Sequence, residues 1–326
     1  VLQDRFKNHC MVVLLLKRHR YLTTLVSSII LLLLYFQNSL LILSERSPCA
    51  CHICVSDRKK SDWFRERYNP NVPLLLNSTN SVLHADVSRW WKGLQTVPNT
   101  SSYTKVVDQL FSLFPDKHHY SDAGPDRCRT CAVVGNSGNL LGSNYGPRID
   151  FHDFVIRINK GPTKGYEKDV GLKTTHRIMY PESAVDLDNS THLVLFPFKI
   201  LDIEWLISAF SSKTIIQTYS KVPSTIKANK DKVMVLHPAF IRYVFDNWAE
   251  GHGRYPSTGF LTLIFALHIC DEVNVFGFGA TSGGIWHHYF EKTLTSYQGV
   301  HAGKFENEII SQLQKINKIL VHMGRT

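Results

Sequence analysis

The segment Cys131-Ala-Val-Val-Gly-Asn-Ser-Gly-Asn139 joins a short apolar run to a glycine-containing turn. Similar runs recur along the chain, and segments with helical periodicity separate them. The runs are Cys131–Val134, Phe154–Ile158, His176–Tyr180, His192–Phe196, Val233–Leu236 and Val273–Phe276, with Ile319–Val321 as a candidate last strand. The helical segments are Asp202–Phe210, Ala239–Trp248, Thr258–Ile269 and a final one that places Ile309, Ile310, Leu313 and Ile316 on one stripe. This alternation predicts an α/β domain with a mainly parallel twisted sheet flanked by helices.

The turn Gly135–Asn139 directly follows the first predicted strand. Ligands of open α/β sheets bind at the carboxyl ends of strands, and a glycine turn lets backbone N–H groups approach them closely. The pattern Gly-x-Gly-x-x-Gly is absent, which argues against a dinucleotide site. We therefore predict a nucleotide-binding loop here, and a turn that only reverses the chain is the alternative.

The segment Tyr21–Leu43 contains no charged residue and would span roughly 35 Å as a helix. Lys17, Arg18 and Arg20 precede it, so the positive-inside rule predicts a cytosolic N-terminus and a luminal remainder. A cleaved signal peptide is the alternative, but the apolar stretch is longer than a signal sequence needs. The expected organisation is a cytosolic tail (1–20), a transmembrane signal anchor (21–43), a short stem (44–62) and a luminal catalytic domain (63–326).

Six of the seven cysteines follow the predicted anchor, namely Cys49, Cys51, Cys54, Cys128, Cys131 and Cys270. An even number in an oxidising compartment predicts three disulfides, and a zinc site is the alternative. Sequons occur at Asn77, Asn99 and Asn189, which agrees with a glycosylated luminal domain.

The net charge of +10 at pH 7 raises the question of nucleic-acid binding. Part of the excess lies beside the predicted anchor, and no basic stripe or RNA-binding signature occurs. A secretory location also removes such a partner. A basic luminal surface favours anionic small molecules and acidic glycoproteins.

The segment Pro256-Ser-Thr-Gly259 directly precedes an apolar helical pattern. The N–H groups and the dipole at a helix N-terminus favour an anion, so we predict part of a ligand site here. An ordinary N-cap is the alternative, because Ser and Thr cap helices in any protein.

Two histidine motifs follow, Trp286-His-His-Tyr-Phe-Glu291 and Val300-His301, the latter with Glu306 five residues on. Imidazole titrates near neutral pH, so a histidine can donate to a phosphate or act as a general base. The alternatives are an aromatic surface patch or a transition-metal site for the first motif, and a solvated side chain for His301. Glu306 opens the last predicted helix, where we expect a structural role.

These segments, in this order, resemble the four sialylmotifs of the animal sialyltransferases, glycosyltransferase family 29. The matching blocks are Cys131–Asn139, His237–Gly259, Trp286–Glu291 and Val300–Glu306. The resemblance covers roughly residues 49–326 and is closest to the β-galactoside α-2,3-sialyltransferases that act on Galβ1-3GalNAc. It implies a variant GT-A-like (Rossmann-like) fold, CMP-N-acetylneuraminate as donor, and a single-pass type II protein of the Golgi membrane. Galactose-terminated glycoproteins or glycolipids would be the acceptors.

The resemblance also implies roles for individual residues. His301 would be the general base, and His288 would stabilise the leaving phosphate. Donor contacts would come from Asn136, Asn159, Tyr219, Tyr255, Ser257, Thr258 and Gly259. Acceptor contacts would come from Gln95, Tyr180, Ser183 and Trp286. A disulfide Cys131–Cys270 is implied, and we expect Cys49–Cys54 and Cys51–Cys128 for the remaining cysteines.

No metal is expected, although Asp186-Leu-Asp188 has the spacing of a divalent-metal pair. This pair directly precedes the Asn189 sequon, where a glycan would crowd a buried ion. CMP carries a single phosphate, which histidine and tyrosine donors can stabilise as it leaves. The resemblance agrees, because sialyltransferases of this type require no metal.

Two departures from the subfamily border the expected active site. Phe290 stands where the subfamily usually has Trp, and the segment from Glu291 to Val300 is several residues short. The predicted reaction is an inverting single displacement onto the 3-hydroxyl of galactose. The alternatives are transfer to Galβ1-4GlcNAc and a catalytically weakened glycan-binding paralogue.

Overall fold

The computed structural model describes residues 20–37, 47–58, 61–94, 101–117, 119–280, 287–291 and 299–324. The chain divides into two compact units, Val1–Ser47 and Pro48–Thr326. In the first unit, the helix Arg20–Gln37 is long and apolar enough to cross a membrane, and none of it is buried. Length and composition therefore fit the predicted anchor.

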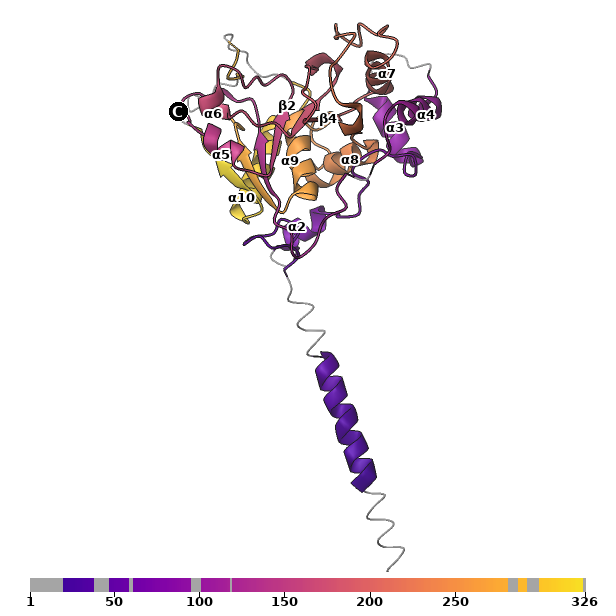
Figure 1. Cartoon of the computed structure of the whole chain (residues 1–326), viewed down its shortest axis with the longest axis vertical. Coiled ribbons are helices and arrows are strands. Elements are labelled where there is room, and N and C mark those ends of the chain that lie inside the picture. Colours follow the sequence, from indigo (N-terminus) through magenta and orange to yellow (C-terminus); the bar gives the residue numbers. More distant parts are fainter. Residues whose placement is uncertain are drawn as a thin grey trace, which may run out of the picture. The chain divides into compact units, whose positions relative to one another are not determined.

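The second unit is built on a parallel sheet of seven strands in the order β5-β4-β3-β2-β1-β6-β7 (Figure 1). All six pairings are parallel. The strands are β1 (Thr130–Val134), β2 (Phe154–Ile158), β3 (His176–Met179), β4 (His192–Leu195), β5 (Val233–Val235), β6 (Glu272–Phe276) and β7 (Leu320–His322). The predicted fold class is confirmed, and each predicted strand matches an observed one within two residues.

Helices cover both faces of this sheet. They are α2 (Asp62–Arg67), α3 (Ala85–Gly93), α4 (Tyr103–Leu113), α5 (Gly146–Asp150), α6 (Glu167–Val170), α7 (Ile200–Ala209), α8 (Pro238–Tyr243), α9 (Thr258–Ile269) and α10 (Gly303–Lys315). Cys131 and Val133 of β1 pack in one core with α2, α8, α9 and α10. Ala132 and Val134 pack on the other face with α5 and α6. Since both faces are buried, the strands read as continuous apolar runs.

Helix α9 is apolar on nearly its whole circumference because it is a core helix. Its residues from Phe260 to Leu267 are all buried, and it packs across β1, β2 and β6. Ser257 begins the helix as its N-cap and accepts a hydrogen bond from the Phe260 N–H at 3.1 Å. A helix that is buried on every side has no polar face that would turn toward solvent. The orientation of α9 therefore depends on its packing against the sheet.

Part of the segment that we expected to form a stem packs against the domain. Cys49, Cys51 and Cys54 are buried, and Val55 belongs to the main core. The buried Lys318 ammonium donates to the carbonyl oxygens of Cys54 and Val55, at 3.3 and 2.9 Å. The compact unit therefore begins near Pro48, before the expected domain boundary at residue 63.

The structure contains three disulfides, which are the three pairs expected above. They are Cys49–Cys54, Cys51–Cys128 and Cys131–Cys270. The last one joins β1 to the C-terminus of α9 and spans 139 residues, whereas the first spans only five. In the chain-entropy account, the stabilisation by a disulfide grows with the length of the loop that it closes.

Removal of the long-range disulfide by Cys131→Ala/Cys270→Ala is expected to cost about 5 kcal/mol of unfolding free energy. The matched control is Cys49→Ala/Cys54→Ala, whose short loop predicts a loss of about 2 kcal/mol. Urea unfolding of the two variants measures the difference. Equal losses would show that loop length does not decide the stabilisation here.

A histidine pair lies at the amino ends of β3 and β4. His176 and His192 are register partners whose rings stack 4.7 Å apart. Burial lowers the pKa of His176 well below its usual value, and the neighbouring His192 and Arg129 lower it further. The ring is therefore neutral in the folded protein and takes up a proton more readily when the chain unfolds.

His176→Phe is expected to weaken the acid sensitivity of the fold. A depressed histidine pKa contributes stability that is present above about pH 6.5 and is lost as the pH falls toward the folded-state pKa. The melting temperature of His176→Phe should therefore fall less between pH 7 and pH 5 than that of the unaltered chain. The exposed His52 provides a control, and His52→Phe should not change this slope; an unchanged slope in His176→Phe would contradict the assignment.

Candidate active site

The candidate site begins at the point where the strand order reverses. The chain runs from β1 to β2 on one side and returns later to β6 on the other side of β1. The crevice at the carboxyl ends of two such strands is where open α/β sheets bind ligands. The loop after β1, with Gly135 and Asn136, lies at this crevice, where the sequence predicted a nucleotide-binding loop.

This loop is locked to the end of β6 by backbone hydrogen bonds. Gly135 N donates to Phe276 O at 2.8 Å, and Ser137 N donates to Gly277 O at 3.0 Å. A Cβ atom on Gly135 would lie 2.3 Å from the Gly277 oxygen. Only glycine therefore allows the two strand ends to approach this closely.

The segment 287–291 packs on the same loop. Gly138 N donates to His287 O at 2.7 Å, and Tyr289 N donates to Asn136 O at 2.9 Å. Ser137 and His288 form an isolated antiparallel bridge. The structure thus brings the first histidine motif directly beside the predicted nucleotide loop, although about 150 residues separate them in the sequence.

Two asparagines follow adjacent strands. The Asn136 side-chain N–H donates to Ile158 O at 3.0 Å. Asn159 has a positive φ of 53° at the end of β2, and its Oδ1 accepts a hydrogen bond from Ser183 Oγ at 2.9 Å. These predicted donor and acceptor residues therefore gather at the carboxyl ends of β1, β2 and β3.

Three tyrosines lie near one another beside this edge. Phe198 contacts the ring of Tyr255, with centroids 5.2 Å apart, and that of Tyr180, with centroids 6.0 Å apart. Burial raises the pKa values of Tyr180 and Tyr255. Desolvation and the Glu182 carboxylate raise the pKa of Tyr219. All three phenols therefore keep their protons and are available as hydrogen-bond donors at neutral pH.

His301 is held in one orientation by Tyr255. Its Nδ1 lies 2.9 Å from the Tyr255 carbonyl oxygen, and the two rings meet edge to face at 4.9 Å. A carbonyl oxygen can only accept, so Nδ1 carries the proton in this assignment of the tautomer. Nε2 then bears the free lone pair, which is the arrangement that a general base needs.

Glu306 links the starts of α9 and α10. Its carboxylate accepts from Ser257 N at 2.7 Å and from Ser257 Oγ at 2.5 Å. Burial raises the pKa of Glu306, and the hydrogen bonds from Ser257 oppose this shift. The contacts fix the N-terminus of α9, with Thr258 and Gly259, close to His301, which agrees with the structural role expected for Glu306.

His288 is paired with an acid three residues on in the sequence. Its Nδ1 lies 2.9 Å from Glu291 Oε2, and its ring stacks on Phe290 with centroids 5.2 Å apart. The side chain is 49% exposed. When the ring is protonated, Glu291 accepts from Nδ1–H and leaves Nε2–H to donate to a phosphate.

Gln95, Trp286 and Asn99 fall outside the described residues, as does most of the segment from Glu291 to Val300. Asp188 accepts from Ser190 N at 2.7 Å and Thr191 N at 2.9 Å. This aspartate therefore stabilises the turn that precedes β4, which is a structural role for the Asp188 carboxylate.

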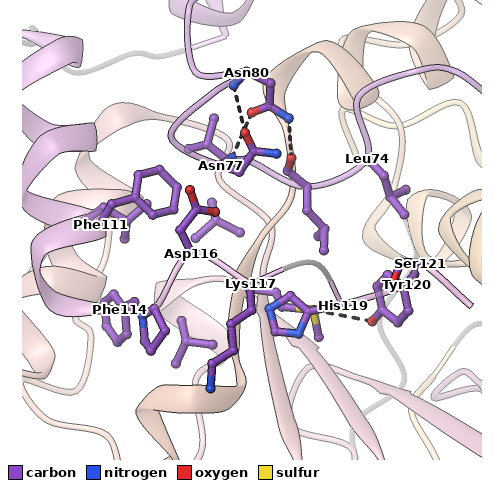
Figure 2. Close-up of a pocket in the computed structure, with 17 residues that line it drawn as sticks. Leu74, Asn77, Asn80, Phe111, Phe114, Asp116, Lys117, His119, Tyr120 and Ser121 are labelled. Atoms are coloured by element: carbon purple, nitrogen blue, oxygen red, sulfur yellow. Dashed lines mark hydrogen bonds between the residues drawn. The ribbon is translucent and has the colours of Figure 1, made fainter.

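A cavity of about 250 Å³ lies at the β5 edge of the sheet, lined by the 74–77 segment, α4, and residues 115–117 and 119–121 (Figure 2). It contains none of the predicted donor or acceptor residues. Asn77 lies at this cavity, and its Oδ1 accepts hydrogen bonds from Thr79 N and Thr79 Oγ1. The cavity is thus separate from the candidate active site.

Sequence reasoning missed three charged residues beside the tyrosines. Lys199 and Asp202 are buried near the start of α7. The carboxylates of Glu182 and Asp202 each lie within 3.4 Å of the Lys199 ammonium. Lys199 and Asp202 stand in an apolar stretch with no recognisable spacing. Only the unusual presence of charge in a buried helix start could have indicated them.

The sequence model of glycosyltransferase family 29 (sialyltransferase) matches residues 75–318. The chain belongs to this family. The human CMP-N-acetylneuraminate-beta-galactosamide-alpha-2,3-sialyltransferase 1 is 47% identical to it over 288 residues, which cover 87% of this chain and 85% of the human protein. The predicted resemblance is therefore confirmed, and the protein is a glycosyltransferase.

Solved structures of family 29 proteins agree. A mammalian sialyltransferase in complex with Gal-beta-1-3GalNAc-ortho-nitrophenol matches with a TM-score of 0.80 at 48% identity, covering 85% of this chain and 100% of that chain. A more distant relative, the chimpanzee CMP-N-acetylneuraminate-beta-1,4-galactoside alpha-2,3-sialyltransferase, is 34% identical over 213 residues, or 59% of this chain and 57% of its own length.

Proposed function

We propose that this protein transfers sialic acid from CMP-N-acetylneuraminate to the 3-hydroxyl of terminal galactose, with Galβ1-3GalNAc as its preferred acceptor. The observation that carries the proposal is the meeting of His301, Tyr255 and the α9 N-terminus at one edge of the sheet. There, a base with a free Nε2 lies beside groups suited to a phosphate. The acceptor preference is supported by 47% identity to a β-galactosamide sialyltransferase, against 34% to a β-1,4-galactoside sialyltransferase.

In the proposed mechanism, His301 Nε2 removes the proton from the galactose 3-hydroxyl as that oxygen attacks the anomeric carbon of sialic acid. The bond from this carbon to the phosphate oxygen breaks, and CMP leaves with the electron pair. Attack and departure occur on opposite faces, so the configuration inverts. The phenols of Tyr219 and Tyr255 and the His288 imidazole donate to the phosphate as its charge grows.

The donor site would be completed by neutral groups. Asn136 and Asn159 would contact CMP and sialic acid from the strand ends, and Ser257, Thr258 and Gly259 would present the N-terminus of α9. Tyr180 and Ser183 would lie on the acceptor side, with Gln95 and Trp286. Donors of this kind can stabilise a single departing phosphate, so we propose that the reaction requires no metal.

The proposed setting is the Golgi membrane, with the helix Arg20–Gln37 as a type II anchor and the second unit in the lumen. Length and composition of this helix support the anchor, and three disulfides suit an oxidising compartment. Sequons at Asn77 and Asn189 would then be accessible to glycosylation. The acceptors would be galactose-terminated glycoproteins or glycolipids.

The test compares two disaccharide acceptors. The detergent-solubilised chain is incubated with CMP-sialic acid and either Galβ1-3GalNAc or Galβ1-4GlcNAc, with and without EDTA. Faster transfer to Galβ1-3GalNAc that EDTA does not slow is the expected result. Faster transfer to Galβ1-4GlcNAc would overturn the acceptor assignment, and CMP binding with no transfer to either would indicate a glycan-binding paralogue.

A further inference from the structure

A buried group of charged side chains lies beneath Tyr219. Lys199 is 6% exposed, and Asp202 is fully buried. The Lys199 ammonium lies 2.6 Å from Asp202 Oδ1 and 3.4 Å from Glu182 Oε1, and the Glu182 side chain is 7% exposed. Burying such a cluster costs stability that an apolar core of the same volume would not cost. Its position at the edge of the candidate active site points to a function.

Lys199 also contacts the face of a predicted donor-binding tyrosine. Its Nζ lies 4.6 Å from the centroid of the Tyr219 ring. Tyr219 is 59% exposed on a segment closed by the bridge between Gln217 and Lys221. The Tyr180 side chain is a hydrogen-bond partner of Tyr219. A cation over the face of the Tyr219 ring adds a second attraction that orients the ring.

The lysine is itself held rigidly. Asp202 Oδ2 accepts from the backbone N–H groups of Phe198 and Lys199, at 2.8 and 3.1 Å. Glu182 accepts a hydrogen bond from the hydroxyl of Thr218, the residue before Tyr219. The same cluster thus fixes both the backbone next to Tyr219 and the cation beneath its ring.

Glu182 also connects this cluster to the acceptor side. It lies in the 3₁₀ turn Pro181–Ser183, whose Ser183 hydroxyl donates to Asn159 Oδ1 at 2.9 Å. Lys199 therefore lies between the turn that carries the predicted acceptor residues and the segment that carries Tyr219.

We propose that Lys199 is a positioning residue that orients Tyr219 toward the phosphate of the donor. The ammonium contacts the ring face, while Asp202 and Glu182 hold the ammonium in place. The role deepens the proposed function and rests on it, since CMP is the ligand that Tyr219 would meet. Lys199 touches neither substrate and acts through the tyrosine.

A double-mutant cycle of Lys199→Met and Tyr219→Phe tests this role in the full-length, detergent-solubilised chain. CMP affinity is measured by titration calorimetry, and donor KM and kcat are measured in the transfer assay. Lys199→Met should weaken CMP binding and raise donor KM about tenfold, as when one charge-assisted hydrogen bond is largely lost. In the Tyr219→Phe background, the same change should have less than about a twofold effect.

Lys221→Met is the matched control, because Lys221 is an exposed lysine on the same segment. It should leave CMP affinity and donor KM unchanged.

A second Lys199 variant guards against loss of folding. Lys199→Met leaves two buried carboxylates without their cation, so Lys199→Met/Asp202→Asn is made as well, which restores the net charge of the cluster. This variant should fold and still bind CMP weakly.

Undiminished CMP affinity in a folded Lys199 variant would overturn the proposal, as would an equal loss in the Tyr219→Phe background. Unfolding of both Lys199 variants would assign the lysine a purely structural role and would overturn it too. The CMP affinity is measured in the absence of any transfer reaction. If the unaltered chain transfers no sialic acid, the proposed function is refuted, but the CMP affinities of the double-mutant cycle still test the role of Lys199.

Discussion

His301→Ala is expected to lower kcat by about 10²–10⁴-fold, as for the loss of a general base. The hydrogen bond from Nδ1 to the Tyr255 carbonyl leaves Nε2 as the only position that can accept the acceptor's proton. The ring makes no predicted contact with CMP, so CMP affinity and donor KM should change little. Initial rates at saturating donor and acceptor give kcat.

The matched control is His252→Ala. His252 also places Nδ1 3.0 Å from a backbone carbonyl, that of Ala249, and stacks on Phe305 of α10. His252 is exposed, lies near His301 and has no assigned role in transfer. Removal of its side chain should therefore change kcat by less than about twofold. Unchanged turnover in a folded His301→Ala protein would refute the role of His301 as base.

His288→Ala is expected to lower kcat by about 10²–10³-fold, the usual cost of removing one donor to a developing negative charge. His288 is bridged to Ser137 of the predicted nucleotide loop and paired with Glu291. In the proposed mechanism its ring would donate to the leaving phosphate. Glu291→Gln, which keeps the shape of the partner but removes its charge, should have a smaller effect in the same direction.

The two histidine variants are distinguished by CMP binding. His288→Ala should weaken CMP affinity as well as turnover, because in the proposed mechanism the ring would contact the phosphate before and after transfer. His301→Ala should affect turnover alone. If His288→Ala leaves both turnover and CMP affinity unchanged, the phosphate assignment is wrong.

The fold was predictable from the sequence because each strand is buried on both faces. Residues such as Val133 and Val134 point to opposite cores, so the runs are apolar throughout and easily recognised. The helical segment 239–248 was less predictable. It divides into α8 and a π-helical segment, Val244–Trp248, and local periodicity does not distinguish these two helix types.

The candidate site was predictable only in part. The loop at Gly135 was expected at a strand end, and the structure places it at the reversal of strand order. The roles predicted for His288 and His301 came from the resemblance. No local pattern indicates that His288 will lie beside Ser137, which is about 150 residues earlier in the sequence. The cluster of Glu182, Lys199 and Asp202 left no sequence signal beyond the presence of charge in an apolar helix start. Lys199 and Asp202 are three residues apart, but Glu182 joins them only through the packing of α7 beside the turn Pro181–Ser183.

The boundary of the domain was also not predictable from composition. Residues 48–58 are rich in cysteine and polar side chains, which is typical of a stem. Their burial depends on contacts with distant residues, such as the bonds from Lys318 to the backbone of Cys54 and Val55. Long-range contacts of this kind are absent from any local pattern.

The most direct test of the proposed reaction is the structure of the product. The chain is incubated with CMP-sialic acid and Galβ1-3GalNAc, and the trisaccharide is analysed by NMR and by digestion with an α-2,3-specific sialidase. The expected product carries α-linked sialic acid on the galactose 3-hydroxyl, with the anomeric configuration inverted relative to the donor. A product linked through another hydroxyl, or one with retained configuration, would contradict the proposed single displacement onto that position.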